Sequence, residues 1–198
     1  MASSPDALLP ILRSPRQGEL LAWLFLDPDE GEYSTSDLAR RLGVSQPTIS
    51  READRLAASG LITERRYGRL RLLRANMDTP IARPLTDLLA VSYGPLPVLA
   101  GRLAPIHGIE HAFIYGSWAA RHQGEPGPVP RDVDVLVVGD ADIGELYDAA
   151  QDAERILRRE VNVRQVSPEA WAHERAAFLE TVRSRPLTEI PLQRETAR

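Results

Sequence analysis

The sequence predicts a two-domain protein of the α+β class, and three observations along the chain lead to that prediction. Short amphipathic helices followed by a hairpin are expected before residue 77. Prolines then cluster between residues 80 and 105, and beyond them strands and helices alternate, as in a mixed sheet flanked by helices. We therefore expect one domain at residues 1–79, a connecting helix and linker at 80–105, and a second domain at 106–198.

Composition excludes several classes of site. The 198 residues are 43% hydrophobic and 26% charged, which is ordinary globular composition. Without cysteine, the chain has no disulfide, thiolate zinc site or cysteine nucleophile, and because it also has no lysine it has no Walker A loop and forms no Schiff base. The longest apolar run, Leu20 to Leu26, is too short for a bilayer, so we expect a cytoplasmic protein with no membrane partner.

The first elements have recognisable ends. Residues 16–26 are apolar at helical spacing and stop before Pro28. Ser34 or Thr35 then supplies a capping oxygen for a short helix that ends at Gly43.

A second short helix and a hairpin follow. Ser45 and Pro47 open this helix, its apolar positions Ile49, Ala53 and Leu56 form one stripe, and Gly60 ends it. Residues 61–65 and 70–74, with a turn at Tyr67-Gly68, are then expected to pair as a two-stranded hairpin.

The second half of the chain alternates between strand and helix patterns after an apolar helical stretch at Leu85 to Tyr93. Tyr147 and Trp171 are expected in the core. The expected order is a strand at 110–115, a helix from Ser117, a Gly/Pro-rich loop at 124–130, a strand at 132–138, a helix at 143–159, a strand at 161–166 and a helix at 168–183.

The basic charge is concentrated in one segment. The chain has a net charge of −4, yet residues 33–76 contain nine arginines against four carboxylates. Opposite Ile49, the second helix would present polar side chains to a DNA major groove, and the hairpin would place arginines near phosphates. The expected DNA-binding residues are Gln46, Thr48, Ser50, Arg51 and Arg55 on the helix and Arg65, Arg66 and Arg69 on the hairpin. The alternative is an ordinary helical domain with surface arginines, or a helix-turn-helix that contacts protein.

The segment STSDLARRLGVSQPTISREADRLAASGLITERRYGRLRLLRAN resembles ArsR- and MarR-like regulators with a winged helix-turn-helix. The resemblance covers about residues 33–76. It implies that the second helix reads double-stranded DNA and that the protein acts as a homodimer.

The most specific chemistry lies at Gly116-Ser117 and at Asp132-Val133-Asp134. Residues two apart on a strand face the same side, so the two carboxylates would project together and favour a divalent cation, Mg²⁺ or Mn²⁺. Gly-Ser between a strand and a helix offers backbone N–H groups and a hydroxyl to an anion such as a triphosphate. Arg121 or Arg131 could neutralise its charge.

The order strand, Gly-Ser, helix, loop and Asp-x-Asp resembles the minimal members of the DNA polymerase β-like nucleotidyltransferase superfamily, over about residues 109–171. The resemblance implies that Gly116 and Ser117 bind the triphosphate and that Asp132 and Asp134 are the catalytic, metal-holding pair. An acceptor hydroxyl would attack the α-phosphorus and pyrophosphate would leave. The third acid of the family pattern is replaced by Asn162, a poor base, although Glu160 points to the same face.

The sequence is therefore compatible with three functions. The favoured one is a DNA-binding transcriptional regulator whose second domain binds a nucleoside triphosphate and metal, either as an effector with degenerate catalysis or with slight remaining transferase activity. The alternatives are an active, antitoxin-like nucleotidyltransferase acting on a protein or small-molecule hydroxyl, and an adaptor that uses neither site. The four histidines show no metal-ligand spacing, and Trp118 could stack on a base or simply pack.

Overall fold

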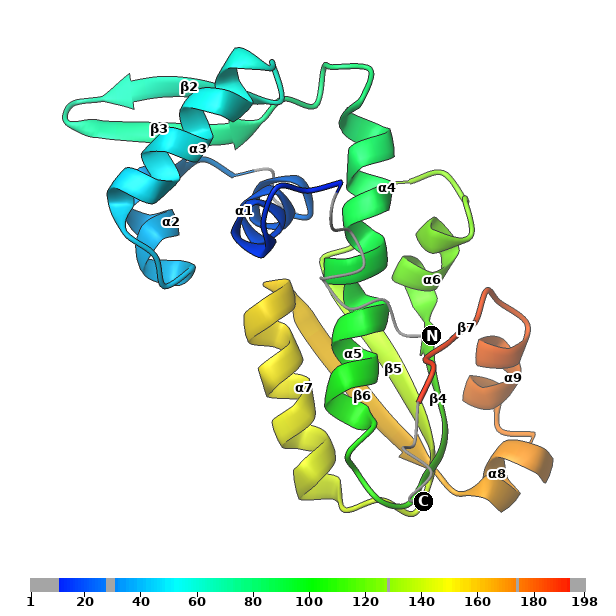
Figure 1. Ribbon diagram of the computed structural model, residues 1–198. Coiled ribbons are helices and arrows are strands. Elements are labelled where there is room, and N and C mark those ends of the chain that lie inside the picture. The colour runs from blue at the N-terminus through cyan, green and yellow to red at the C-terminus, as the bar shows by residue number, and fades with distance from the viewer. Residues whose placement is uncertain (1–10, 28–30, 128, 174, 193–198) are drawn as a thin grey trace. The chain divides into compact units, whose positions relative to one another are not determined.

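The chain divides into two compact units between Tyr93 and Gly94. A computed structural model describes residues 11–27, 31–127, 129–173 and 175–192 (Figure 1). Each unit has its own cluster of buried apolar side chains. The boundary falls inside the segment expected to connect the domains. None of the helices described is long and apolar enough to cross a membrane.

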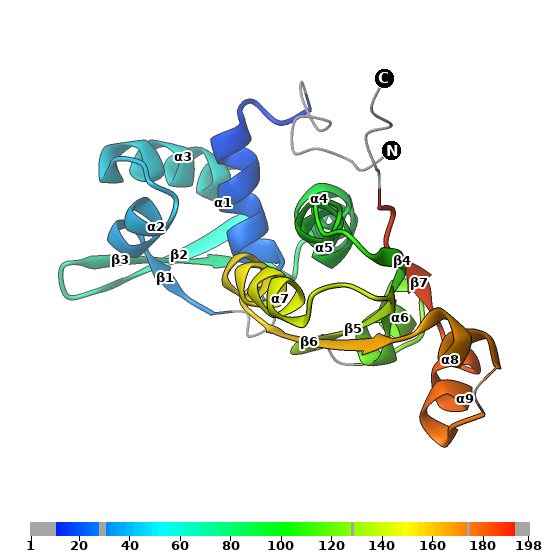
Figure 2. The ribbon, with the colours of Figure 1, turned by 90° about the horizontal axis from the view of Figure 1, so that it is seen from below.

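The N-terminal unit combines helices with a small antiparallel sheet. Its elements are α1 (Pro15–Phe25), β1 (Tyr33–Ser34), α2 (Thr35–Arg41), α3 (Gln46–Ala58), β2 (Ile62–Tyr67), β3 (Leu70–Ala75) and α4 (Ala82–Tyr93). The strand order is β1-β3-β2, so the long β2–β3 hairpin gains a short third strand (Figure 2). Two helices, a tight turn and this hairpin form a winged helix-turn-helix, as the sequence predicts.

Local signals set the ends of these elements. The Ser34 side chain accepts a hydrogen bond from the backbone N–H of Asp37 and caps α2, which decides between the two expected capping residues. Gly43 follows the C-cap of α2 and opens the turn between the two helices with a φ of +63°, a conformation that L side chains rarely adopt. Ser45 stands at the N-cap of α3 with Pro47 in the first turn. Buried side chains pack α2 and α3 against the small sheet, and those of Leu38, Ala53 and Leu73 are fully buried.

The C-terminal unit is a four-stranded mixed sheet with helices. Its elements are α5 (Pro95–Leu103), β4 (Ile109–Tyr115), α6 (Gly116–His122), β5 (Asp132–Gly139), α7 (Ile143–Leu157), β6 (Glu160–Val166), α8 (Pro168–His173), α9 (Ala177–Arg183) and β7 (Thr188–Glu189). The strand order is β6-β5-β4-β7, with β5 and β6 parallel and the other pairs antiparallel.

The two faces of this sheet are covered by different helices. Val133, Val135 and Val137 point to the face on which α5 and α7 pack (Figure 2). Leu136 points the other way and packs with Leu179 and Val182 of α9. Because side chains alternate along a strand, Asp132 and Asp134 share the face of Leu136.

The structure corrects several expected boundaries. The segment 95–103, expected to be part of a linker, forms α5, because prolines are tolerated in the first turn of a helix. The single helix expected at 168–183 is instead two short helices, α8 and α9, with residue 174 outside the described ranges. The short strands β1 and β7 were not expected.

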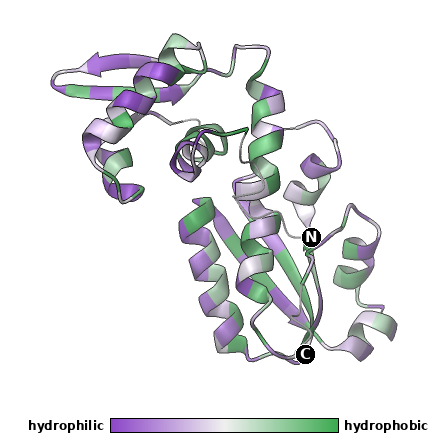
Figure 3. Ribbon diagram, in the orientation of Figure 1, coloured by the Kyte–Doolittle hydropathy of each residue, from purple (hydrophilic) through white to green (hydrophobic). Residues whose placement is uncertain are grey.

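The prediction that Tyr147 lies in the core is wrong, because its side chain is 67% exposed. The buried stripe of α7 runs through Leu146, Ala150 and Ala153, one position away. Figure 3 shows the corresponding division, with hydrophobic and hydrophilic stretches alternating along α7. Trp171 is half-buried and stacks on Phe113.

Candidate functional site

The acidic pair and the Gly-Ser turn lie together at one end of the C-terminal sheet. The hydroxyl of Ser117 donates to Oδ1 of Asp132 at 3.3 Å. A Cβ atom on Gly116 would lie 2.6 Å from Oδ2 of Asp134, so a larger residue would force the carboxylate to move, and the φ of +73° also favours glycine. The residues that the sequence analysis singled out on separate elements are therefore neighbours.

The neighbouring strand completes this end of the sheet. In the parallel β5–β6 register, Glu160 lies beside Asp132, and Asn162 lies beside Asp134. The side-chain amide of Asn162 donates to Oδ1 of Asp134 at 3.3 Å. The position at which the family pattern expects a third acid is thus occupied by a hydrogen-bond donor that touches the acidic pair.

Electrostatic repulsion is concentrated on Asp134. Burial raises the pKa of its carboxyl, the hydrogen bond from Asn162 lowers it, and the charges of Asp132 and Glu160 raise it further. Within the described part of the chain, no group of three or more His, Asp or Glu side chains is arranged to hold a metal ion. Two adjacent carboxylates remain, which suits a Mg²⁺ ion that takes its other ligands from phosphates and water.

Of the two arginines expected beside this site, Arg121 is held by a neighbouring loop, whereas Arg131 directly precedes Asp132. The Arg121 guanidinium turns to the following loop, where Nη1 donates to the carbonyl oxygen of Glu125 at 2.6 Å and the group lies against Gly127. Arg131 is exposed at the residue before β5.

A different arginine shares the sheet face of the acidic pair. Arg164, two residues after Asn162 on β6, lies with its guanidinium carbon 3.9 Å from the ring centroid of Phe178. The Tyr115 ring meets the same phenylalanine edge-on at 5.8 Å. Burial and the charge of Asp134 raise the pKa of Tyr115, while the charge of Arg164 lowers it. Sequence reasoning missed Arg164 because strand pairing places it there.

The second candidate site is the exposed face of α3. Ile49, Ala53 and Leu56 are buried, as predicted, while Gln46, Arg51 and Arg55 are exposed and Thr48 and Ser50 are half-buried. Within the described ranges, Arg51 makes no hydrogen bond or ion pair.

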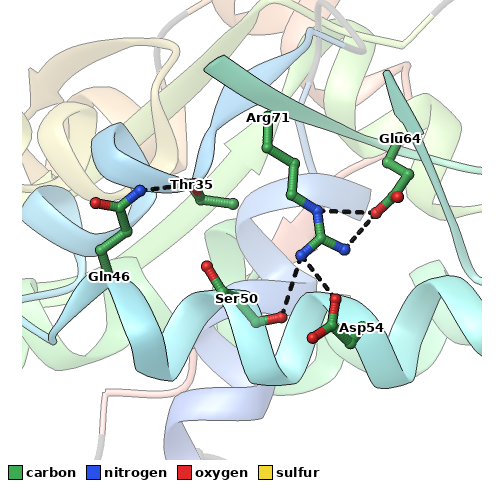
Figure 4. Close-up of polar contacts among 6 residues, drawn as sticks. All are labelled: Thr35, Gln46, Ser50, Asp54, Glu64 and Arg71. Atoms are coloured by element: carbon green, nitrogen blue, oxygen red, sulfur yellow. Dashed lines mark hydrogen bonds and ion pairs between the residues drawn. The ribbon is translucent and has the colours of Figure 1, made fainter. Parts of the chain in front are cut away.

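The other polar side chains of α3 contact neighbours. Arg55 pairs with Glu52 at 3.0 Å, and Glu52 in turn accepts from Gln17 at 2.7 Å. The Gln46 amide donates to the Thr35 hydroxyl at 3.3 Å across the turn, as Figure 4 shows. Thr48 shares a hydrogen bond with Ser45 at 2.8 Å.

The arginines of the hairpin differ in whether they contact an acidic side chain. Arg65 forms hydrogen bonds with Glu32 at 2.8 Å, and this contact lowers the pKa of the glutamate. Arg66 and Arg69 are exposed and, as far as the structure describes the chain, have no acidic partner. Two of the three expected hairpin arginines are therefore available for an external anion.

Comparison with known proteins identifies a family for part of the N-terminal unit. Residues 14–68 match the model of the MarR family. These residues are a MarR-type winged helix-turn-helix domain. The crystal structure of the transcriptional regulator BldR from Sulfolobus solfataricus is similar at 25% identity with a TM-score of 0.33, covering 43% of this chain and 58% of that one. The chain thus spans little more than half of that regulator. No curated protein sequence matches the chain.

One polar contact of the MarR-type domain was not expected from the sequence. Arg71 of β3 pairs with Asp54 of α3 at 2.7 Å and with Glu64 of β2, where its Nε donates at 2.9 Å (Figure 4). Its Nη1 also donates to the backbone carbonyl of Ser50 at 3.4 Å. Side chains alternate along β3, so Arg71 lies on the same face as the buried Leu73. This alternation is the only feature of the sequence that could have indicated a contact between Arg71 and α3.

Proposed function

We propose that the chain is a transcriptional regulator that binds double-stranded DNA through α3 and the β2–β3 hairpin. The observation that carries the proposal is the set of free cations on one MarR-type domain: Arg51 on the exposed face of α3, and Arg66 and Arg69 on the hairpin. An arginine on a recognition helix suits guanine edges, whereas hairpin arginines suit phosphates.

Fluorescence anisotropy tests this proposal with a duplex from upstream of the protein's own gene and a scrambled duplex. We expect Arg51→Ala to weaken binding to the preferred duplex by about tenfold or more, since a good base contact contributes about 1–3 kcal/mol. Arg83→Ala is the matched control, because Arg83 is exposed on α4 and lies outside this surface. Equal affinity of the wild-type protein for both duplexes would reject sequence-specific DNA binding.

We further propose a two-fold homodimer, since two recognition helices related by two-fold symmetry fit two DNA half-sites one helical turn apart. Sedimentation of the free protein and of its DNA complex measures the stoichiometry. One chain per duplex at saturation would contradict the dimer.

The C-terminal unit, we propose, binds a nucleoside triphosphate together with Mg²⁺ or Mn²⁺. Support comes from the contact of the Gly116-Ser117 turn with Asp132 and Asp134. Burial, and to a lesser extent the charges of Asp132 and Glu160, raise the pKa of Asp134, and a bound cation would stabilise its ionised form. Asp132 and Asp134 would hold the metal, which would bridge them to the phosphates. The Ser117 hydroxyl and nearby backbone N–H groups would bind the phosphate oxygens.

Calorimetry with each nucleoside triphosphate, with and without Mg²⁺, tests this second part. We expect metal-dependent binding that Asp132→Asn removes and that Asp148→Asn, an exposed change on α7, leaves intact. Absence of binding by the wild-type protein for every triphosphate would reject it.

Binding without transfer is favoured over an active nucleotidyltransferase because Asn162 cannot act as a base at the third position. Incubation with labelled triphosphates, Mg²⁺ and candidate acceptors distinguishes the two functions. Transfer of label that stops in the Asp132→Asn variant would instead support the enzyme.

A further inference from the structure

The guanidinium of Arg71 joins the recognition helix to both strands of the hairpin. Asp54 of α3 lies 2.7 Å from Nη1, Glu64 of β2 accepts from Nε at 2.9 Å, and the Ser50 carbonyl lies at 3.4 Å. Figure 4 shows the cation between the helix and the strands. One side chain that extends from β3 therefore contacts both α3 and β2.

The contact on α3 covers one specific turn. Ser50 and Asp54 are four residues apart, which is one turn of an α-helix, and Arg51 lies within that turn. Holding the carbonyl at one end and the carboxylate at the other fixes the position of the turn relative to β3. Arg51 is the exposed arginine that this turn carries.

Arg71 is unsuited to contact DNA phosphates itself. Two carboxylates share its charge, and its side chain is only 21% exposed. Its cross-strand partner Arg66 differs, since it is exposed and free of acidic partners in the described structure. Two arginines directly opposite each other on the hairpin thus have different surroundings.

We propose that Arg71 is a positioning residue for sequence-specific DNA binding. It holds the turn of α3 that carries Arg51 at a fixed distance from the hairpin and does not itself bind a phosphate. The inference rests on the DNA-binding function proposed above. A recognition helix must enter the groove while the hairpin meets the backbone, so their relative position decides whether base contacts form.

The test separates sequence preference from phosphate binding. For each variant, affinity is measured for the preferred and the scrambled duplex across a range of salt concentrations. The logarithmic salt slope falls by about 0.9 for each phosphate that the protein no longer neutralises, whereas a positioning residue changes the preference instead. We expect Arg71→Ala to lower the ratio of the two affinities by about tenfold, the usual effect of removing one good base interaction, with the salt slope unchanged.

Matched variants make the result specific. Arg66→Ala should lower the salt slope by about one and keep the affinity ratio. Asp54→Asn should reproduce the loss of preference because it removes the helix end of the contact, and it serves as the test if Arg71→Ala does not fold by thermal melting and circular dichroism. Arg71→Lys should restore only part of the preference, since an ammonium cannot contact two carboxylates as a planar guanidinium does.

Two results would overturn the inference: a reduced salt slope with an unchanged ratio in Arg71→Ala, which would make Arg71 a phosphate ligand, or no change in either quantity. Wild-type protein that shows no preference between the duplexes would instead reject the proposed function itself.

Discussion

At the scale of single residues, Asp134 shows how a carboxylate in the proposed nucleotide site would oppose stability. Burial raises the pKa of its carboxyl, and Asp132 and Glu160 raise it further, against the hydrogen bond from Asn162. A carboxyl whose pKa is raised on folding stabilises the fold below its unfolded pKa of about 3.9. This contribution is lost as the pH rises through the folded pKa, so the ionised group destabilises the fold at neutral pH.

We therefore predict that Asp134→Asn raises the melting temperature at pH 7 and raises it less at pH 3, where the wild-type carboxyl is protonated in both states. The same variant should lose Mg²⁺-dependent nucleotide binding. Differential scanning calorimetry at the two pH values and titration with the triphosphate measure the two effects. Asp148→Asn is the control, and an equal stabilisation at both pH values would contradict the electrostatic explanation.

Arg164 is the cation that β6 places on the sheet face of the acidic pair. It shares a sheet face with Asn162, packs over Phe178 and has no acidic partner in the described part of the chain, whereas Arg121 is bonded to Glu125. Stacking on an aromatic ring holds a guanidinium in place without neutralising it.

We predict that Arg164→Gln weakens nucleoside triphosphate binding by about tenfold, a typical loss for one charge-assisted hydrogen bond of about 1.5–3 kcal/mol. Arg121→Gln should weaken it less. Calorimetry of both variants against wild type makes the comparison. The assignment fails if Arg121→Gln has the larger effect.

At the level of elements, the sequence predicted what depends on local signals. The cap at Ser34, the turn at Gly43 and the buried stripe of α3 are set within a few residues, and each was expected. The helix α5 was not predicted because Pro95 and Pro97 are typical of a linker, although a first helical turn accepts proline.

The candidate sites divide in the same way. The acidic pair and the Gly-Ser turn are sequence motifs, so their residues can be predicted without knowledge of the contact between them. Arg71 and Arg164 depend on strand register and on packing against distant helices, which a single sequence does not encode locally. The orientation of the Arg121 side chain toward the loop after α6 is likewise not encoded in the local sequence.

The junction of β4 and α6 depends on a glycine. Gly116 has a φ of +73°, and an added Cβ would lie 2.6 Å from the Asp134 carboxylate. We predict that Gly116→Ala destabilises the C-terminal unit by about 1–2 kcal/mol from backbone strain alone and impairs nucleotide binding. Denaturant unfolding measures the effect.

Gly101 provides the matched control for this prediction. It lies within α5, and an added Cβ would meet nothing within 4 Å. Gly101→Ala should stabilise the helix by about 0.5–1 kcal/mol. The explanation is wrong if the two substitutions change the free energy of unfolding in the same direction.

At the scale of the whole molecule, two separately packed units occupy one chain. Leu38 and Leu73 belong to the core of the first, and Ile114 and Val135 to that of the second. Only Gly94 separates α4, the last helix of the first unit, from α5, the first helix of the second. Two binding activities in such a chain become one regulatory function only if each ligand changes the affinity for the other.

We predict that a Mg²⁺-bound triphosphate changes DNA affinity by about 5- to 150-fold, the usual range of allosteric coupling, and that DNA changes triphosphate affinity by the same factor. Reciprocity is a thermodynamic requirement, so the two factors check each other. Anisotropy with and without saturating nucleotide gives one, and calorimetry with and without the preferred duplex gives the other. Asp132→Asn should abolish the effect on DNA while leaving DNA binding itself intact. Two independent affinities, each unchanged by the other ligand, would mean that the nucleotide site does not regulate DNA binding.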